Sequence, residues 1–334
     1  MQSKAGQAKS KLTWKEFKAS PSYINKRDKA LNSGKGFLLG IFRFVVIVGI
    51  SYVILAPVIK IIADSFFSIT DAINPMVFTI PINPTLDRYA MAIKYMDYLP
   101  ILGSTLLYVL GITVIQVMIC SMVGYGFARY KFPLKGLLFG FIVVMIVVPL
   151  NTIQFPLYTT FRYFNPLGLV GLFNGGKSIN LLQTPWPTII MSVFGCGLRS
   201  GLFIYIFNQF FRGLPKEIEE AALVDGAGTW RTYFRIMMPN ASPAVITVAV
   251  FSIVWQYNDS FFASNFNIPE SILITRKLES LVATIANVEK VMNIREQQLY
   301  FDAGVVLVLV PVVLVYLVLQ RRFIEGVERS GIVG

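Results

Sequence analysis

Long apolar segments alternate with polar ones along the chain after residue 36. Apolar runs of about 20 residues predict helices that cross a membrane, because a helix of that length matches the hydrocarbon thickness. The expected spans cover residues 37–62, 102–128, 137–158, 185–210, 241–262 and 303–319. The predicted fold is therefore an all-α polytopic membrane protein with six transmembrane helices.

The polar segments divide the chain into three predicted parts. Residues 1–36 form a basic N-terminal extension, residues 37–322 the six-helix domain, and residues 323–334 a C-terminal tail. Three connections inside the helical domain are expected to be outer loops, and the last of them should contain a short helix around Leu278–Val291. These connections are residues 65–100, 160–184 and 263–301.

A polar island of mixed charge, residues 213–239, lies between the fourth and fifth expected spans. It opens with a proline and three glutamates, which are typical of a helix start because carboxylates interact favourably with that end of a helix. Gly226 is typical of a helix end, and a second short helix should follow it. Ile218, Ala222 and Asp225 share one helix face, and small side chains on an exposed face would let a soluble partner approach closely.

Composition and charge narrow the class of protein. Only 14% of the residues are charged, against about 25% in soluble domains. The net charge of +12 could suggest a nucleic-acid partner, but the basic residues flank the apolar spans, so none is expected. The proposed cytoplasmic segments hold 19 Lys and Arg residues and the proposed outer segments eight. By the positive-inside rule, the island and both termini face the cytoplasm.

Residues that commonly carry catalysis or bind metals are scarce. The chain has no histidine, which removes the commonest general base and the commonest metal ligand. Cys120 and Cys196 lie inside expected spans and are interpreted as small apolar packing residues. We therefore expect no catalytic residue and no metal site.

Residues 171–178 match the pattern of a phosphate-binding P-loop, Gly-x4-Gly-Lys-Ser. A working P-loop follows a strand and opens a helix, so that backbone N–H groups surround the phosphates. This match lies in a predicted outer loop with no strand before it, and we interpret it as a chance match. Any ATP chemistry must then come from another chain.

Polar and aromatic residues near the outer halves of two spans are candidates for a substrate path. Sugars bind to aromatic faces flanked by hydrogen-bonding groups, and polar residues inside a membrane are commonly functional. An alternative interpretation is an interfacial aromatic belt with polar groups that cap helices. Arg199, inside the fourth span, is interpreted as structural or gating. The candidates are Asn151, Gln154, Trp255, Gln256, Tyr257, Asn258 and Asp259.

The basic extension has two open interpretations. Trp14 and Phe17 stand three residues apart among lysines. A short helix with this pattern could lie on anionic membrane lipid. The same composition is typical of a solvated tail.

The island carries a motif that is more specific than its charge pattern. Glu220-Ala221-Ala222 is followed after three residues by Gly226, and after nine more by Ile236-Met237-Met238-Pro239. The pattern resembles the signature cytoplasmic loop of bacterial ABC-importer permeases, EAA-x3-G-x9-I-x-L-P, with Met238 in place of the leucine. In that family the loop forms a coupling helix that docks into a cleft of the ATPase subunit. The resemblance implies an ATPase-coupling site made of Glu220, Ala221, Ala222, Asp225, Gly226, Gly228 and Pro239.

Three further segments resemble the carbohydrate branch of that superfamily, specifically its maltose-type inner-membrane subunits with six spans. They are residues 124–133, residues 197–211 and the ending 323–334, which is similar to the tail of the second subunit of such pairs. The resemblance implies the type I importer permease fold in a bacterial plasma membrane. It also implies a heterodimer with a second permease subunit, two ATPase subunits that hold ATP and magnesium, and an extracytoplasmic solute-binding protein. The tail would reach into the ATPase dimer, and segment 263–301 would contact the binding protein.

The expected function is that of a non-catalytic permease subunit of an ATP-driven sugar (oligosaccharide) importer. ATPase closure would act through the island and switch the spans between inward and outward access. One alternative is an ABC permease for a peptide or another small polar nutrient, which shares the signature. A second is a proton- or sodium-driven transporter, against which the lack of histidine and the scarcity of carboxylates within the spans count. A third is a membrane scaffold or receptor whose island recruits a soluble partner.

Overall fold

The computed structural model describes the backbone of residues 21–331 and the side chains of residues 36–320, except 38 and 319. Residues 1–20 of the predicted extension, with Trp14 and Phe17, and the last three residues of the tail lie outside the described part. Within the described part every named element is a helix. The chain divides into two compact units, residues 1–60 and 61–334.

Helix α2 (Pro21–Asp64) makes up the described part of the first unit and continues into the second. Its segment Leu39–Asp64 is long and apolar enough to cross a membrane, in agreement with the first expected span. The helix begins well before the predicted boundary at residue 37. Pro21 stands at the first position, where its missing N–H breaks no helical hydrogen bond.

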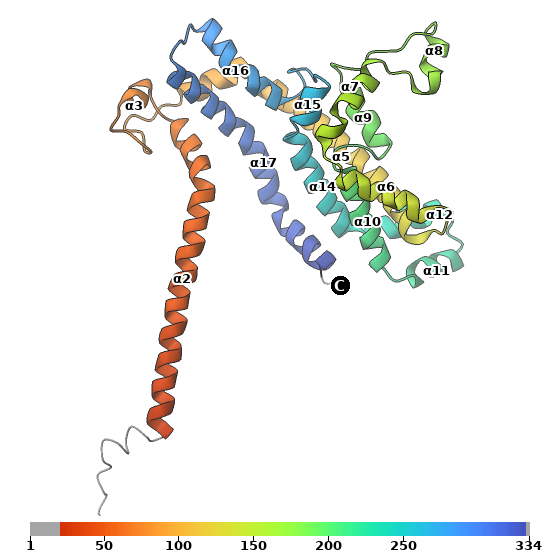
Figure 1. Ribbon diagram of the computed structural model, residues 1–334, viewed down its shortest axis with the longest axis horizontal. Coiled ribbons are helices and arrows are strands. Elements are labelled where there is room, and N and C mark those ends of the chain that lie inside the picture. Colours follow the sequence, from red (N-terminus) through yellow and green to blue (C-terminus); the bar gives the residue numbers. More distant parts are fainter. Residues whose placement is uncertain (1–20, 332–334) are drawn as a thin grey trace, which may run out of the picture. The chain divides into compact units, whose positions relative to one another are not determined.

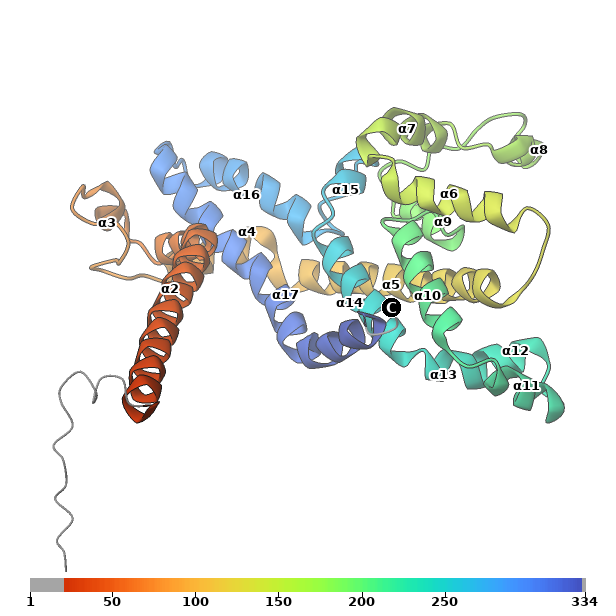
Figure 2. The same cartoon turned by 60° about the horizontal axis from the view of Figure 1, so that its bottom comes forward.

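Helix α5 (Tyr98–Arg129) is central to the second unit (Figures 1 and 2). The helices that pack most extensively against it are α9 (Trp186–Val193), α10 (Ser200–Gly213) and α14 (Ser242–Tyr257). The buried cluster between α5, α10 and α14 includes Cys120, Phe207 and Val248. Cys120 is thus the packing residue that was predicted, whereas Cys196 is exposed and the same prediction for it was wrong.

Helix α17 (Ile294–Gly331) packs on α14 and on α16 (Ile274–Val288). The short helix predicted around Leu278–Val291 is confirmed by α16, which starts and ends a few residues earlier. Helix α17 begins ahead of the expected span at residue 303. The backbone of the expected tail is helical up to Gly331, and its side chains lie outside the described ones.

The third expected span is not one helix. Helix α6 (Lys135–Val147) is followed by the 3-10 turn η1 (Leu150–Ile153) and α7 (Gln154–Arg162), and the path bends by 103° between them. Pro149 causes the break. Its ring disfavours the helical conformation at Val148, which is extended with φ −68° and ψ 123°, and it has no N–H to continue the helix.

The fourth expected span is also divided, into α9 and α10. Gly195 and Arg199 between them have φ values of 71° and 59°, so the chain turns through the left-handed region twice. Of the helices in the described residues, three are long and apolar enough to cross a membrane, or up to five if each of two bent pairs is one span. The expected number of six spans stays a prediction.

Smaller helices lie in the segments that were expected to be outer loops. Only one of these segments was predicted to contain a helix, and α4 was missed although it packs against α16 and α17. The P-loop-like segment 171–178 starts inside α8 and follows a 3-10 turn, not a strand, which supports its interpretation as a chance match. The elements are α3 (Ile69–Ile73), α4 (Asp87–Met96), η2 (Pro166–Gly168), α8 (Leu169–Phe173) and α15 (Phe261–Asn265).

Candidate functional site

The island 213–239 folds into a hairpin of short helices, called the island hairpin below (Figure 2). Its first arm is α11 (Glu217–Val224). The predicted helix end at Gly226 is confirmed, with a φ of 75° that suits glycine. The turn is closed by N–H groups that donate back into α11, from Asp225 to the Ala221 carbonyl at 3.0 Å and from Ala227 to the Ala222 carbonyl at 2.9 Å.

The second arm of the island hairpin is three consecutive helical pieces that run into one another. They are α12 (Thr229–Thr232), the π-helical turn η3 (Tyr233–Met237) and α13 (Met238–Asn240). This arm bends by 77° where it meets α14. The predicted helix, turn and helix are therefore all present.

The exposed face of α11 is not the one that was predicted. Ala222 is only 3% exposed, and Ile218 packs against the cluster of α5 and α10. The expected exposed face through Ile218 and Ala222 was therefore wrong, because that face attaches the hairpin to the rest of the chain. The other signature residues, Glu220, Ala221, Asp225, Gly226, Gly228 and Pro239, are exposed.

Two apolar residues of the hairpin were missed by sequence reasoning. Leu223 is 61% exposed and Val224 is 88% exposed, next to the exposed Ala221. Their position directly after the signature alanines, at the end of an otherwise acidic helix, was the available signal. Together these side chains give α11 an apolar tip beside an acidic flank.

An ion pair braces the first arm against the central helix. Arg129, in the last turn of α5, lies 3.0 Å from Glu219 and donates a hydrogen bond of 2.8 Å to the Leu214 carbonyl. Both side chains of the pair are mostly buried, so the pair is weakly screened by solvent. The second arm is tied to the same helix, since the hydroxyl groups of Tyr233 and Ser121 are 2.6 Å apart. Both arms of the hairpin are therefore in direct contact with α5.

A buried glutamine connects three helices at mid-length of α5. The Gln116 Nε2 donates to the Leu198 carbonyl at 2.9 Å and to the Ser200 Oγ at 3.2 Å. Its Oε1 accepts from the Ser252 Oγ at 2.7 Å and from the Gln256 Nε2 at 3.3 Å. Gln116 thus holds the broken turn before α10 and joins it to α14.

Replacing Gln116 with leucine should lower the free energy of unfolding by about 2 kcal/mol, because the Leu198 carbonyl and three side chains lose a buried partner. Thermal unfolding of the detergent-solubilised protein measures the change. Gln209→Leu on α10 is the matched control, since Gln209 is exposed and the same substitution there should change stability by less than about 0.5 kcal/mol. Equal effects of both substitutions would show that the buried network contributes nothing specific.

A cavity of about 780 Å³ opens where the two broken spans meet. It is lined by the α6–η1 bend, by the turn between α9 and α10 and by the start of α15. Arg199 and Asn151 are among its polar lining residues, and the exposed Cys196 lies there too. The Arg199 guanidinium lies 5.7 Å from the ring centre of Trp255, a distance at which a cation and an aromatic face attract each other.

The structure separates the candidate substrate-path residues. Asn151 lines the cavity, while Gln154 is exposed outside its lining. Trp255 stacks on Phe251 with ring centres 5.0 Å apart and lies under Arg199. The last two residues of α14, Gln256 and Tyr257, and the two that follow mainly serve the fold.

Four candidates have their polar groups engaged inside the chain. Gln256 belongs to the Gln116 network, and the Tyr257 hydroxyl donates to the Val308 carbonyl at 2.9 Å. Asn258 donates to the Val254 carbonyl at 2.9 Å, and Asp259 accepts from the Phe261 and Phe262 N–H groups. For Asn258 and Asp259 this is the helix-capping arrangement of the alternative interpretation.

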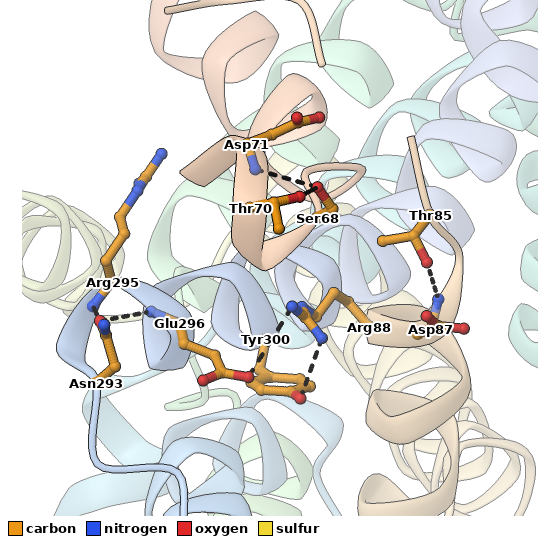
Figure 3. Close-up of polar contacts among 10 residues, drawn as sticks. All are labelled: Ser68, Thr70, Asp71, Thr85, Asp87, Arg88, Asn293, Arg295, Glu296 and Tyr300. Carbon is orange, nitrogen blue, oxygen red and sulfur yellow. Dashed lines mark hydrogen bonds and ion pairs between the residues drawn. The ribbon is translucent and has the colours of Figure 1, made fainter. Parts of the chain in front are cut away.

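A polar cluster that sequence reasoning missed joins α4 to the start of α17 (Figure 3). The buried Arg88 points at Tyr300, donating to its hydroxyl at 3.2 Å with the guanidinium 4.8 Å from the ring centre, and lies 4.0 Å from Glu296. One residue earlier on α17, Arg295 pairs with Asp64 at 3.1 Å. The signal was the set of opposite charges in two segments that were expected to be separate loops.

Known proteins with similar sequence share most of the chain. It is 28% identical over 280 residues to the diacetylchitobiose uptake system permease protein of Streptomyces coelicolor, with 84% of each chain covered. It is 27% identical over 259 residues to the trehalose transport system permease protein of Mycobacterium tuberculosis, covering 76% of this chain and 84% of that one.

The fold also matches a solved structure. A chain in the crystal structure of a bacterial ABC transporter involved in the import of the acidic polysaccharide alginate superposes with a TM-score of 0.65 at 19% identity. The match covers 86% of this chain and 98% of that chain. At this identity the likeness establishes the type I importer permease fold.

A family model described as the inner membrane component of binding-protein-dependent transport systems matches residues 116–329. That range includes the island hairpin, the Gln116 network and all the cavity-lining turns described above. ATP is used by partner ATPase subunits in this family, so the chain is not itself catalytic. The chain belongs to the inner membrane components of binding-protein-dependent transport systems, as a multi-pass permease component of an ABC transporter.

Proposed function

We propose that this chain is a transmembrane subunit of a sugar or oligosaccharide importer, and that the island hairpin couples ATPase closure to alternating access. The single observation that carries the coupling is the exposed signature helix α11, which is braced by Glu219 against Arg129 at the end of α5. The two relatives named above are described as uptake systems for diacetylchitobiose and trehalose, which supports a sugar as the solute.

The assembly follows from the family. In this assembly the chain is a permease subunit of the second-subunit type. It pairs with another permease subunit, and the pair binds two ATPase subunits and an extracytoplasmic solute-binding protein. The hairpin and both termini lie in the cytoplasm, as the distribution of basic residues predicts. Glu220, Ala221 and the apolar tip of α11 dock into the ATPase, and Ala222 contributes by packing the helix in place.

Transmission runs through α5. When the ATPase moves α11, the Arg129–Glu219 pair pulls on one end of α5, and Gln116 lies on the same helix. Gln116 holds the turn before α10, which lines the 780 Å³ cavity. The hairpin and the cavity are thereby joined by one rigid helix and a set of buried hydrogen bonds, so movement at one alters the other.

The cavity is our candidate for this chain's part of the sugar path. Arg199 and Asn151 offer hydrogen-bond donors to hydroxyl groups, and the ring of Trp255 supports the guanidinium from below. Several lining side chains are apolar, among them Ile146 and Leu150, which suits a surface that the second permease subunit completes.

Reconstitution tests the function. The chain is co-purified with its partners, inserted into liposomes with ATP inside, and supplied outside with the binding protein and radiolabelled solutes. Uptake of an oligosaccharide that depends on ATP hydrolysis and on the binding protein is the expected result. Uptake of a peptide or amino acid in place of any sugar would favour the alternative permease class, and uptake without ATPase subunits would contradict the coupling.

A further inference from the structure

The second arm of the island hairpin presents two aromatic and two basic side chains side by side. Trp230 is 67% exposed and Phe234 is 42% exposed, and their rings stack with centres 6.1 Å apart at an angle of 20°. Arg231 and Arg235 are exposed next to them. The four residues line an open hollow of about 490 Å³ and are called the aromatic–arginine face below.

The opposite face of the same arm fixes this orientation. Tyr233 and Met237 belong to the buried cluster beneath, Thr232 is also buried, and Tyr233 is within hydrogen-bonding distance of Ser121 on α5. The arm therefore cannot roll to hide its exposed aromatic rings. Two large rings held outward on a well-packed helix indicate a surface that meets something other than water.

The direction of the arm places this face near a membrane surface. Residues 229–240 bend by 77° from α14, and only the two segments together are long and apolar enough to form one broken span. With α14 along the membrane normal, an arm at 77° to it runs close to the membrane plane. Tryptophan rings and arginine side chains are both favoured at that level, where the ring is partly buried and the guanidinium meets phosphates.

Charge distinguishes the two arms of the hairpin. The first turn of α11 carries Glu217, Glu219 and Glu220. In the second arm, neither Arg231 nor Arg235 forms an ion pair with a carboxylate among the described side chains. An anionic membrane surface attracts the second arm and repels the first, so the arms suit different partners.

We propose that the aromatic–arginine face binds the headgroups of anionic phospholipids in the cytoplasmic leaflet. Trp230 and Phe234 lie at the boundary between headgroups and acyl chains, and the two arginines pair with lipid phosphates. The ATPase then receives α11 while the second arm rests on the membrane. The inference goes beyond solute transport and depends on the proposed function only for the cytoplasmic placement of the hairpin.

Quenching of Trp230 fluorescence by brominated lipid tests the proposal. The assembled complex is placed in vesicles of phosphatidylcholine that contain an equal fraction of either brominated phosphatidylglycerol or brominated phosphatidylcholine. The signal of Trp230 is the difference between the complex and its Trp230→Phe variant. We expect stronger quenching by brominated phosphatidylglycerol, with local enrichment of about fivefold for each arginine at low salt, which falls as salt is raised.

Three variants separate a specific contact from general charge. The double variant Arg231→Gln/Arg235→Gln should lose the preference for phosphatidylglycerol, and Arg231→Lys/Arg235→Lys should keep it. Arg212→Gln is the matched control, because Arg212 is exposed in the last turn of α10, outside the aromatic–arginine face, and its loss should leave the preference unchanged.

Two results would overturn the proposal. The first is equal quenching by the two brominated lipids, or none, in an assembled complex. The second is release of the ATPase by the glutamine double variant with an unaltered lipid preference, which would show that the second arm binds protein. If the glutamine variant fails to assemble, the salt dependence of quenching in the unmutated complex still decides the outcome. All of these readouts are independent of which solute is transported.

Discussion

Replacing Glu220 with lysine should lower ATP-dependent uptake by at least about tenfold, because it reverses a charge at the surface proposed to dock into the ATPase. Glu220 is exposed and makes no ion pair or hydrogen bond among the described residues, so the fold should lose less than about 0.5 kcal/mol. Uptake and ATP hydrolysis are measured in proteoliposomes, and insertion is checked by size-exclusion chromatography of the extracted complex.

Glu217→Lys is the control for the docking prediction. It makes the same charge change on the same helix, at another exposed position that lies outside the signature. Its effect on uptake should stay within about twofold, as for an exposed ion pair at the rim of an interface. Unchanged uptake with Glu220→Lys would contradict the coupling role. An equal collapse with both variants would mean that the total charge of the arm matters, and no single contact.

Replacing Gly124 with alanine should destabilise the protein by about 3 kcal/mol, the upper part of the range for overpacking. An added methyl group would stand 2.6 Å from the Phe207 Cβ and 3.0 Å from both the Asn208 nitrogen and the Ile204 carbonyl oxygen. Two of these atoms belong to the backbone of α10, so the helices would have to separate. The Gly124 carbonyl also accepts a hydrogen bond from the buried Asn208, which the separation would strain.

Gly111 lies on the same helix, and there we expect alanine to be tolerated. No atom lies within 4 Å of a methyl group added there. Gly111→Ala should therefore leave stability unchanged or raise it by about 0.5–1 kcal/mol, because alanine has less freedom in the unfolded chain. Thermal unfolding of the solubilised protein compares the two variants, and a loss of similar size in both would show that close packing of α5 on α10 is not the cause.

The hairpin shows which structural features are determined by nearby residues in the sequence. Its acidic start, its end at Gly226 and its second helix were all predicted, since helix ends depend on nearby residues and on dihedral preferences. The face that it would expose was predicted wrongly, because Ile218 and Ala222 meet α5 and α10. Which side of an amphipathic helix is covered depends on elements distant in the sequence.

The two broken spans also show that the sequence predicted one part of the structure and tertiary contacts decided another. Pro149 and the glycines around Arg199 stand within these two spans, yet apolar content alone favoured one continuous helix in each case. Whether a proline bends a helix or ends it depends on what satisfies the freed backbone groups, and here the Leu198 carbonyl is satisfied by Gln116 from α5. The cavity exists only because two such breaks meet, which no local pattern contains.

The sequence by itself determined the class of protein, the hairpin and its signature, because apolar length and short spacings are properties of neighbouring residues. The tertiary structure decided which candidates face the cavity, that Gln256 and Tyr257 are engaged in packing, and that Arg88 meets Glu296 across more than two hundred residues. It also decided that Trp230 and Phe234 point outward. Contacts of this kind arise when helices pack, and side chains far apart along the chain then compete for the same buried space.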